Sequence, residues 1–277
     1  MERGFLNLIS EIQHLNWATL WSLLLLAFIR MAPIVTQAPF LGARLMPAMA
    51  RVGMAFVLSL VFLPNVILHS THTFMLDWSF IGYSVKELLV GFILGYLIAI
   101  PFYIAQSSGI LIDYLRGSSA MISQDATLQV QASPIGNLMN YYLIVLFYAM
   151  DGPLLFFDAI NMSFSVLPAD TFLNPQFFSA HSTFWHNATT ILATLFRISI
   201  QLAAPPLVAI LMAESFLGIA NRLAPQIQIA FLGLALKSLL GLILLWTGWA
   251  FITKHMGKIT IDWVNYTAHW VAAFSKG

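Results

Sequence analysis

The chain has 277 residues, of which 60% are hydrophobic and only 8% are charged, and its formal net charge is +1. A soluble domain carries about 25% charged residues, so a soluble globule this poor in charge could not cover its own surface. The neutral total and the scattered basic residues give no basis for nucleic-acid binding, and the absence of cysteine excludes disulfides and thiolate sites. We therefore predict an all-α polytopic membrane protein.

Six apolar stretches are long enough to cross a membrane, because a spanning helix needs about 20 mostly apolar residues. They are residues 17–35, 52–68, 88–112, 135–160, 188–212 and 229–252. The N-terminus lacks the short apolar core and the cleavage site of a signal peptide, so the first stretch is expected to remain in the protein. We predict no soluble domain and no repeat of fixed period.

Prolines and charges interrupt these stretches. The prolines, which remove backbone donors and disfavour straight helix, are Pro33, Pro101, Pro205 and Pro206. The charged residues are Arg30, Glu87, Asp113, Asp151, Arg197, Glu214 and Lys237. A lone charge at the bilayer centre costs about 2.5–3.5 kcal/mol. We therefore predict broken and kinked helices that face other protein more than lipid.

The basic residues of the loops give conflicting orientations. Arg44 and Arg51 mark the first loop as cytoplasmic, and the lysine-free loop 168–187 indicates an external one. Six spans would then place the C-terminus outside, although the tail carries the cytoplasmic signature of Lys254, Lys258 and Lys276. Either the count of six spans is off by one, or the chain is not a simple serpentine.

No catalytic motif is present. The seven histidines are scattered, and His181 and His186 lack the i, i+4 spacing of a helical metal pair. There is no phosphate-binding glycine loop and no nucleophile elbow. We predict no enzyme, no metal site and no cofactor.

Two motifs concern helix packing. Gly91 and Gly95 are four residues apart, which lets helix backbones approach closely, either within the chain or at a subunit interface. Asn221 and Arg222 form a polar turn that leads through Pro225 and Gln226 into an apolar run containing Lys237. From the pattern alone this is a helical hairpin whose Lys237 extends to the headgroups.

The stretch 111–136 separates two apolar segments and is small and polar after its first residues. Asp113 and Arg116 are three residues apart and share a face if the helix continues, so they can pair. We expect a structural pair at the base of a loop; a proton relay is the alternative, because intramembrane ionisable residues often mark such paths.

Four sequence blocks resemble the type III secretion export-apparatus family SctT, which includes flagellar FliR and injectisome SpaR and YscT. They are "APFLGARLMPAMAR" (38–51), "KELLVGFILGYLIAIPF" (86–102), "GILIDYLRGSSAM" (109–121) and "AESFLGIANRLAPQIQIAFLGLALKSLLGLILL" (213–245). The third block resembles the injectisome branch more than the flagellar one. The resemblance covers roughly residues 20 to 245, and the tail beyond about Lys254 matches no known pattern.

The resemblance implies one export-gate membrane domain over residues 1–277. Residues 1–185 would be similar in fold to SctR, residues 186–255 would form a hairpin similar to SctS, and residues 256–277 would be a tail. The implied partners are SctR-like and SctS-like gate subunits, an SctU-like switch protein, an SctV-like export protein and unfolded secreted polypeptides. The implied location is the bacterial inner membrane, within the basal body of the secretion system.

The resemblance also implies that loop 116–133 projects into a channel and helps to plug it. The candidate plug residues are Arg116, Gly117, Ser118, Ser119, Ala120, Met121, Ile122, Ser123, Gln124 and Asp125. Many members carry Asp-Pro in this loop, whereas this chain reads Asp125-Ala126, which removes a fixed φ angle. The implied subunit interface comprises Gly91, Gly95, Asn221, Arg222, Pro225, Gln226 and Lys237.

Two other classes fit the composition. A secondary transporter or proton-coupled channel would use broken helices around a midplane site. A membrane scaffold would have no conducting role.

Overall fold

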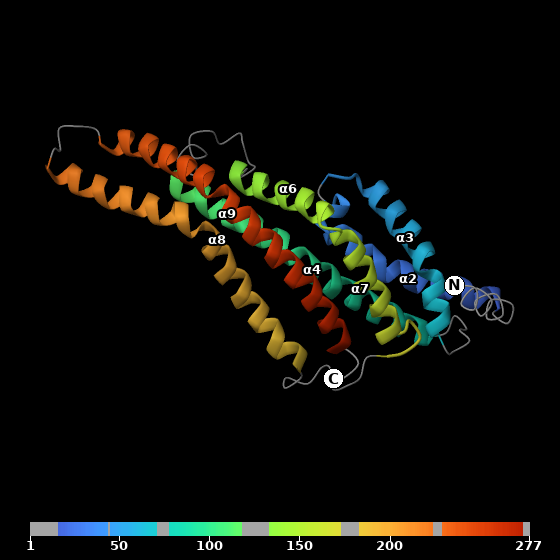
Figure 1. Cartoon of the computed structure of the whole chain (residues 1–277). Coiled ribbons are helices and arrows are strands. Elements are labelled where there is room, and N and C mark those ends of the chain that lie inside the picture. The colour runs from blue at the N-terminus through green and yellow to red at the C-terminus, as the bar shows by residue number, and fades with distance from the viewer. Residues whose placement is uncertain are drawn as a thin grey trace. The chain divides into compact units, whose positions relative to one another are not determined.

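The computed structural model describes residues 16–43, 45–70, 78–117, 133–172, 183–223 and 229–273 (Figure 1). These residues form α2 (Trp17–Gln37), the 3-10 turn η1 (Pro39–Leu41), α3 (Ala48–His69), α4 (Trp78–Arg116), α6 (Pro134–Ala149), α7 (Gly152–Val166), α8 (Thr183–Leu223) and α9 (Ile229–Ala273). No strand occurs in these ranges. The predicted all-α class is confirmed.

Five helices are long and apolar enough to cross a membrane, namely α2, α3, α4 and most of α8 and α9. The predicted stretch 135–160 is instead a bent pair, α6 and α7, which makes a sixth span if it is counted as one. The break falls at Asp151, whose φ of 56° is left-handed, a conformation that aspartate tolerates better than most residues. Pro153 then occupies the first turn of α7, where its missing N–H is harmless.

The predicted broken and kinked helices are confirmed by the α6–α7 pair, which is bent by 78°, but the four prolines named above do not end a helix. Pro33 lies inside α2, Pro101 inside α4, and Pro205 and Pro206 inside α8, and each helix continues past them. Transmembrane helices tolerate such prolines when other groups satisfy the freed carbonyls. Which groups donate hydrogen bonds to those carbonyls therefore matters for the fold.

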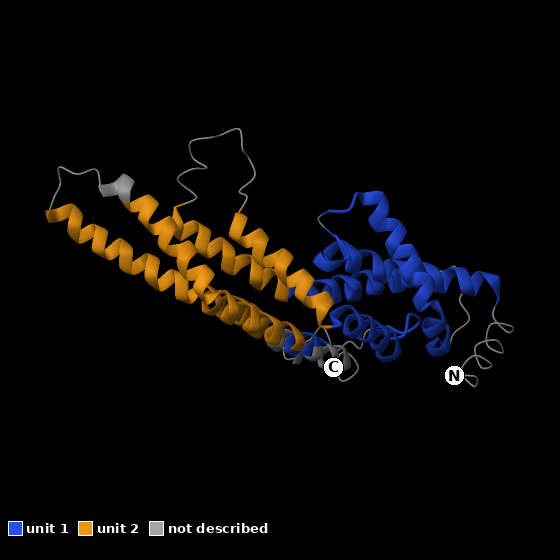
Figure 2. Cartoon of the chain, turned by 45° about the horizontal axis from the view of Figure 1, so that its top comes forward, with its two compact units in different colours: residues 1–100, 151–189, 262–277 blue, residues 101–150, 190–261 orange. Residues whose placement is uncertain are grey.

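The chain divides into two compact units that interleave in sequence (Figure 2). Unit 1 comprises residues 1–100, 151–189 and 262–277, and unit 2 comprises residues 101–150 and 190–261. Helices α4, α8 and α9 each contribute to both units. The division into parts 1–185, 186–255 and 256–277 stays a prediction.

In unit 1, α2 packs against α3 and against the first part of α4. A Cβ atom on Gly91 would collide with the carbonyl oxygen of Arg30, and one on Gly95 would lie 3.0 Å from Cα of Ile34. The two glycines thus let α4 lie directly on the backbone of α2. The structure places them in intrachain packing, and a subunit contact by the same residues stays a prediction.

Unit 2 contains a second close backbone approach, between α4 and α6. A Cβ atom on Gly109 would lie 2.5 Å from Cα of Gly136. The hairpin of α8 and the first part of α9 completes this unit, with the Tyr142 and Trp249 rings in edge contact at 5.0 Å. The two glycines thus let the backbones of α4 and α6 lie in direct contact.

Burial differs sharply between the helices. In α4, 67% of the most apolar window is buried, compared with 28% in α8 and 17% in α9. Helix α4 is therefore mostly buried, whereas the α8–α9 hairpin exposes large apolar side chains. Trp246, Phe216 and Leu223 are 80%, 68% and 81% exposed.

Replacing Gly91 by alanine is expected to destabilise the protein by about 1–3 kcal/mol, because the added methyl group overpacks the α2–α4 contact. The matched control is Gly53→Ala in α3, where nothing lies within 4 Å of the added Cβ. There the substitution is expected to be neutral or stabilising by up to about 1 kcal/mol, from helix propensity alone. Thermal unfolding of the purified chain in detergent checks this; equal effects at both sites would contradict it.

Candidate functional site

One buried carboxylate ties the end of α4 to the start of α6. Asp113, which is 1% exposed, accepts hydrogen bonds through Oδ1 from Nη2 of Arg116 at 3.0 Å and through Oδ2 from Oγ of Ser133 at 2.6 Å. The same Oδ2 accepts from the backbone N–H of Ile135 at 2.9 Å. Asp113 therefore joins the last turn of α4 to the N-terminus of α6.

Ser133 completes this junction as the N-cap of α6. Its Oγ accepts from the backbone N–H of Gly136 at 2.9 Å. Together with Asp113 it satisfies two of the donors that a helix N-terminus leaves open, and the carboxylate also complements the helix dipole. We call Asp113, Arg116, Ser133 and Ile135 the loop base.

The predicted pair of Asp113 and Arg116 is present, with the i, i+3 geometry that the spacing indicated. Gly117 ends α4 with a φ of 92°, which favours glycine. The other predicted plug residues, Ser118, Ser119, Ala120, Met121, Ile122, Ser123, Gln124 and Asp125, lie outside the described residues. Their role stays a prediction.

The loop base also rests on α9, which the sequence did not indicate. A Cβ atom on Gly241 would lie 2.9 Å from Cγ of Arg116, and one on Gly117 would lie 2.9 Å from Cδ1 of Leu234. The stem of Arg116 therefore crosses α9 at a glycine. The only sequence signal was an isolated glycine within an apolar run.

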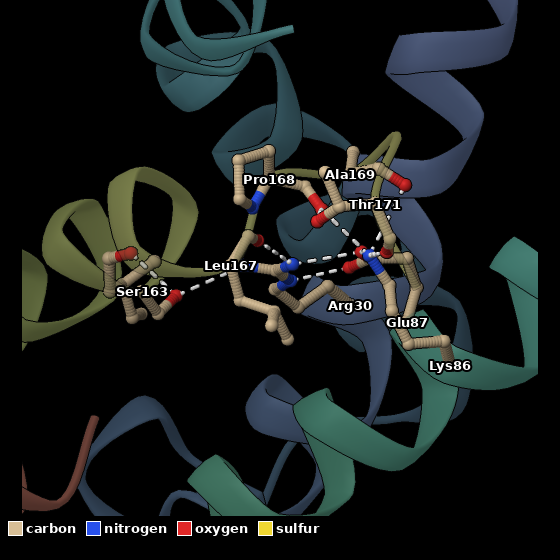
Figure 3. A network of polar contacts seen from close by, with 9 residues as sticks. Arg30, Lys86, Glu87, Ser163, Leu167, Pro168, Ala169 and Thr171 are labelled. Atoms are coloured by element: carbon tan, nitrogen blue, oxygen red, sulfur yellow. Dashed lines mark hydrogen bonds and ion pairs between the residues drawn. The ribbon is translucent and has the colours of Figure 1, made fainter. Parts of the chain in front are cut away.

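A second polar cluster lies inside unit 1, around Arg30 (Figure 3). Arg30 is 0% exposed; Nε donates to Oε2 of Glu87, and Nη2 donates to Oε1 at 2.8 Å. Nη2 also donates to the Leu167 carbonyl at 2.7 Å, and Nη1 donates to Oγ of Ser163 at 3.2 Å. The guanidinium carbon lies 4.1 Å from the centre of the Phe164 ring. Arg30 of α2 is thus joined to α4 and to the end of α7.

Lys86 adds a second cation to this cluster. Its Nζ lies 2.6 Å from Oε1 of Glu87. It donates to the carbonyl oxygens of Pro168 at 2.7 Å, Ala169 at 3.2 Å and Thr171 at 2.9 Å (Figure 3). The ammonium therefore holds the turn that follows α7 against α4.

The buried ions of this cluster are tolerated because each has an opposite charge or hydrogen-bonding groups beside it. Burying ions costs several kcal/mol each, and this is offset only when good geometry and further hydrogen bonds satisfy the remaining groups. The sequence indicated Arg30 and Glu87 as charges within apolar stretches but not their pairing. It missed Lys86, because its partners are main-chain carbonyls more than 80 residues away.

The α8–α9 hairpin carries a third charge pair. Nζ of Lys237 donates to Oε1 of Glu214 at 2.7 Å, and Glu214 is 54% exposed. The pair lies in an open cleft that is also lined by Asn221, Gly218 and Gly233. The structure thus brings the predicted residues Asn221 and Lys237 together. Arg222 is exposed in the last turn of α8, and Pro225 and Gln226 lie outside the described residues.

Replacing Glu87 by glutamine is expected to destabilise the protein by about 3–5 kcal/mol, because it removes the one carboxylate that is paired with both Arg30 and Lys86. The matched control is Glu214→Gln, which breaks an exposed pair and is expected to cost less than about 1 kcal/mol. Thermal unfolding and the amount of protein recovered from membranes measure both. Similar losses in the two variants would contradict the structural role of the cluster.

Comparison with known proteins is consistent with this architecture. The family model for bacterial export proteins, family 1, matches residues 21–262. Secretion system apparatus protein SsaT of Salmonella typhimurium is 28% identical over 240 residues, covering 84% of this chain and 88% of that protein. Surface presentation of antigens protein SpaR of Shigella flexneri is 28% identical over 79% of this chain and 81% of its own length. Flagellar biosynthetic protein FliR of Bacillus subtilis is 27% identical over 80% and 83%. The chain therefore belongs to the bacterial export proteins, family 1, and is a multi-pass inner-membrane protein of the bacterial secretion machinery.

Proposed function

We propose that this protein is a non-enzymatic structural and gating subunit of the export gate. With SctR-like and SctS-like subunits it forms part of the inner-membrane channel for unfolded secreted polypeptides, and loop 116–133 helps to plug the pore. The observation that carries this proposal is the loop base, in which one carboxylate holds both ends of the loop. The names of the relatives, which include secretion and flagellar biosynthetic proteins, support the setting.

The geometry of the loop base suits a plug. In the proposal, Asp113 holds the end of α4 to the start of α6, and the loop between the two helices acts as the plug. The sequence of residues 118–132 contains three serines, three glutamines and one threonine, which offer hydrogen bonds without charge to a passing polypeptide. Met121 and Ile122 supply apolar contacts that exclude water when no substrate is present.

The same contacts support an anchoring role for Asp113 over proton relay. Both carboxylate oxygens accept hydrogen bonds from groups that terminate α4 or begin α6. Ile135 donates from the backbone and Ser133 is the N-cap of α6, so the arrangement is part of the helix junction itself. The alternative of a secondary transporter has no comparable observation in its favour.

The exposed hairpin supports assembly with partners. Large apolar side chains of α8 and α9 point away from the rest of unit 2, and in the proposal SctR-like and SctS-like subunits cover them. The polar end of the hairpin, with Asn221, Arg222 and the Glu214–Lys237 pair, would face the SctU-like and SctV-like components.

Deleting residues 118–131 is expected to raise ion leak through the assembled complex, because the pore loses the segment that narrows it. Conductance of the complex in planar bilayers measures the leak. A variant with the same 14 residues in scrambled order keeps the bulk and the hydrogen-bonding groups and is expected to leak less. Unchanged conductance after the deletion would contradict the plug.

The tagged protein is expected to bring SctR-like and SctS-like subunits with it when it is purified in mild detergent.

Arg222→Glu is expected to lower either this recovery of the two subunits or secretion several-fold, because it reverses an exposed charge at the hairpin end. Arg222→Lys, which keeps the charge, serves as the control. Absence of both subunits from the wild-type preparation would refute the export-gate proposal, and wild-type secretion by Arg222→Glu would refute the role of Arg222.

A further inference from the structure

We propose that Trp263, near the C-terminal end of α9, is a positioning residue that supplies the hydrogen bond which Pro101 removes from α4. The inference goes beyond the proposed export function and does not depend on it. Trp263 also lies one residue past the stretch 21–262 that the family model matches.

The missing hydrogen bond follows from helix geometry. In an α-helix each carbonyl accepts from the N–H four residues further along the chain. The carbonyl of Leu97 is therefore assigned to residue 101, which is proline and has no N–H. Helix α4 nevertheless continues from Trp78 to Arg116, and Leu97 is 4% exposed, so its carbonyl is shielded from water. A buried carbonyl in this position needs another donor.

The side chain of Trp263 is that donor. Its indole Nε1 donates to the carbonyl oxygen of Leu97 at 2.8 Å, across 166 positions of sequence. Indole N–H is a donor only, and a buried tryptophan usually finds one acceptor for it. Trp263 is 7% exposed, so both partners are removed from solvent. Each of the two groups thereby satisfies the other.

The face of α9 around Trp263 is buried against the rest of the protein. Val264 is 5% exposed and Thr267, on the same face as Trp263 at i+4, is 2% exposed, whereas Tyr266 is 42% exposed. The Thr267 hydroxyl donates to the Val264 carbonyl at 2.6 Å, so it is satisfied within α9 itself. The end of α9 is thus docked by one face, which positions the indole.

The position of this hydrogen bond indicates its effect on α4. Helix α4 passes from unit 1 to unit 2 between residues 100 and 101, and α9 passes between the units at residues 261 and 262. The Trp263–Leu97 bond lies inside unit 1, within a few residues of both passages. We infer that it holds α4 as a continuous helix where its own hydrogen-bond ladder is interrupted.

A double-mutant cycle tests this inference on the full-length protein. W263F keeps an apolar ring but removes the N–H, and P101A restores the backbone N–H that the Leu97 carbonyl lacks. In the wild-type background, W263F is expected to speed hydrogen exchange of backbone amides in residues 98–106 about tenfold, as for the loss of one buried hydrogen bond. In the P101A background the same change is expected to have little effect. W246F, which alters the exposed tryptophan of the same helix, is expected to change neither background.

Three outcomes would count against the inference. An equal rise in both backgrounds would mean that the indole acts only by packing, and no rise in the wild-type background would mean that the bond has no positioning effect. If W263F does not accumulate, the double variant P101A/W263F is expected to accumulate, and failure of this rescue would also count against it. None of these measurements uses secretion, so their outcome is independent of the export proposal.

Discussion

The structure depends on one constraint: polar groups inside long apolar helices must find partners within the protein, because lipid offers none. The constraint acts on side chains and backbone alike. The Arg30 guanidinium is met by Glu87, Ser163 and a main-chain carbonyl, and the Lys86 ammonium is met by Glu87 and three carbonyls. The Leu97 carbonyl is met by an indole. In each case residues distant in sequence are brought to one point, which fixes the packing of the helices between them.

Glycine makes these convergences sterically possible. The Arg30 cluster requires α2 and α4 to lie close, and Gly91 sits directly against the carbonyl oxygen of Arg30. The loop base requires α4 and α6 to cross closely, and Gly109 meets Gly136 at that crossing. Arg116 reaches Asp113 with its stem lying across Gly241. The glycines therefore permit the close helix contacts at which the buried charges pair.

Features that depend on residues close in sequence were predicted, and features that depend on residues far apart in sequence were not. Apolar length predicted the helices, and i, i+3 spacing predicted the Asp113–Arg116 pair, because both are local. The break at Asp151 was not predicted, and the predicted stretch 88–112 left open whether the helix continues through Pro101. The donor to the Leu97 carbonyl, which Pro101 leaves without its usual partner, is Trp263, 166 residues away in the sequence. The Lys86 cluster was missed for the same reason, since main-chain carbonyls leave no mark in a sequence.

The distribution of charges along the chain separates what the protein satisfies by itself from what it presents to its surroundings. Arg30, Glu87 and Asp113 are almost completely buried and are paired within the chain. Glu214, in contrast, is half exposed although it is paired with Lys237, and it lies on the hairpin whose apolar side chains are also exposed. A charge pair on an apolar, exposed hairpin is costly in lipid, yet it suits a helix that packs against a neighbouring subunit with polar groups of its own. The buried charges of α2 and α4 are thus satisfied within the chain, and the hairpin is the part whose environment the rest of the export apparatus completes in the proposed function.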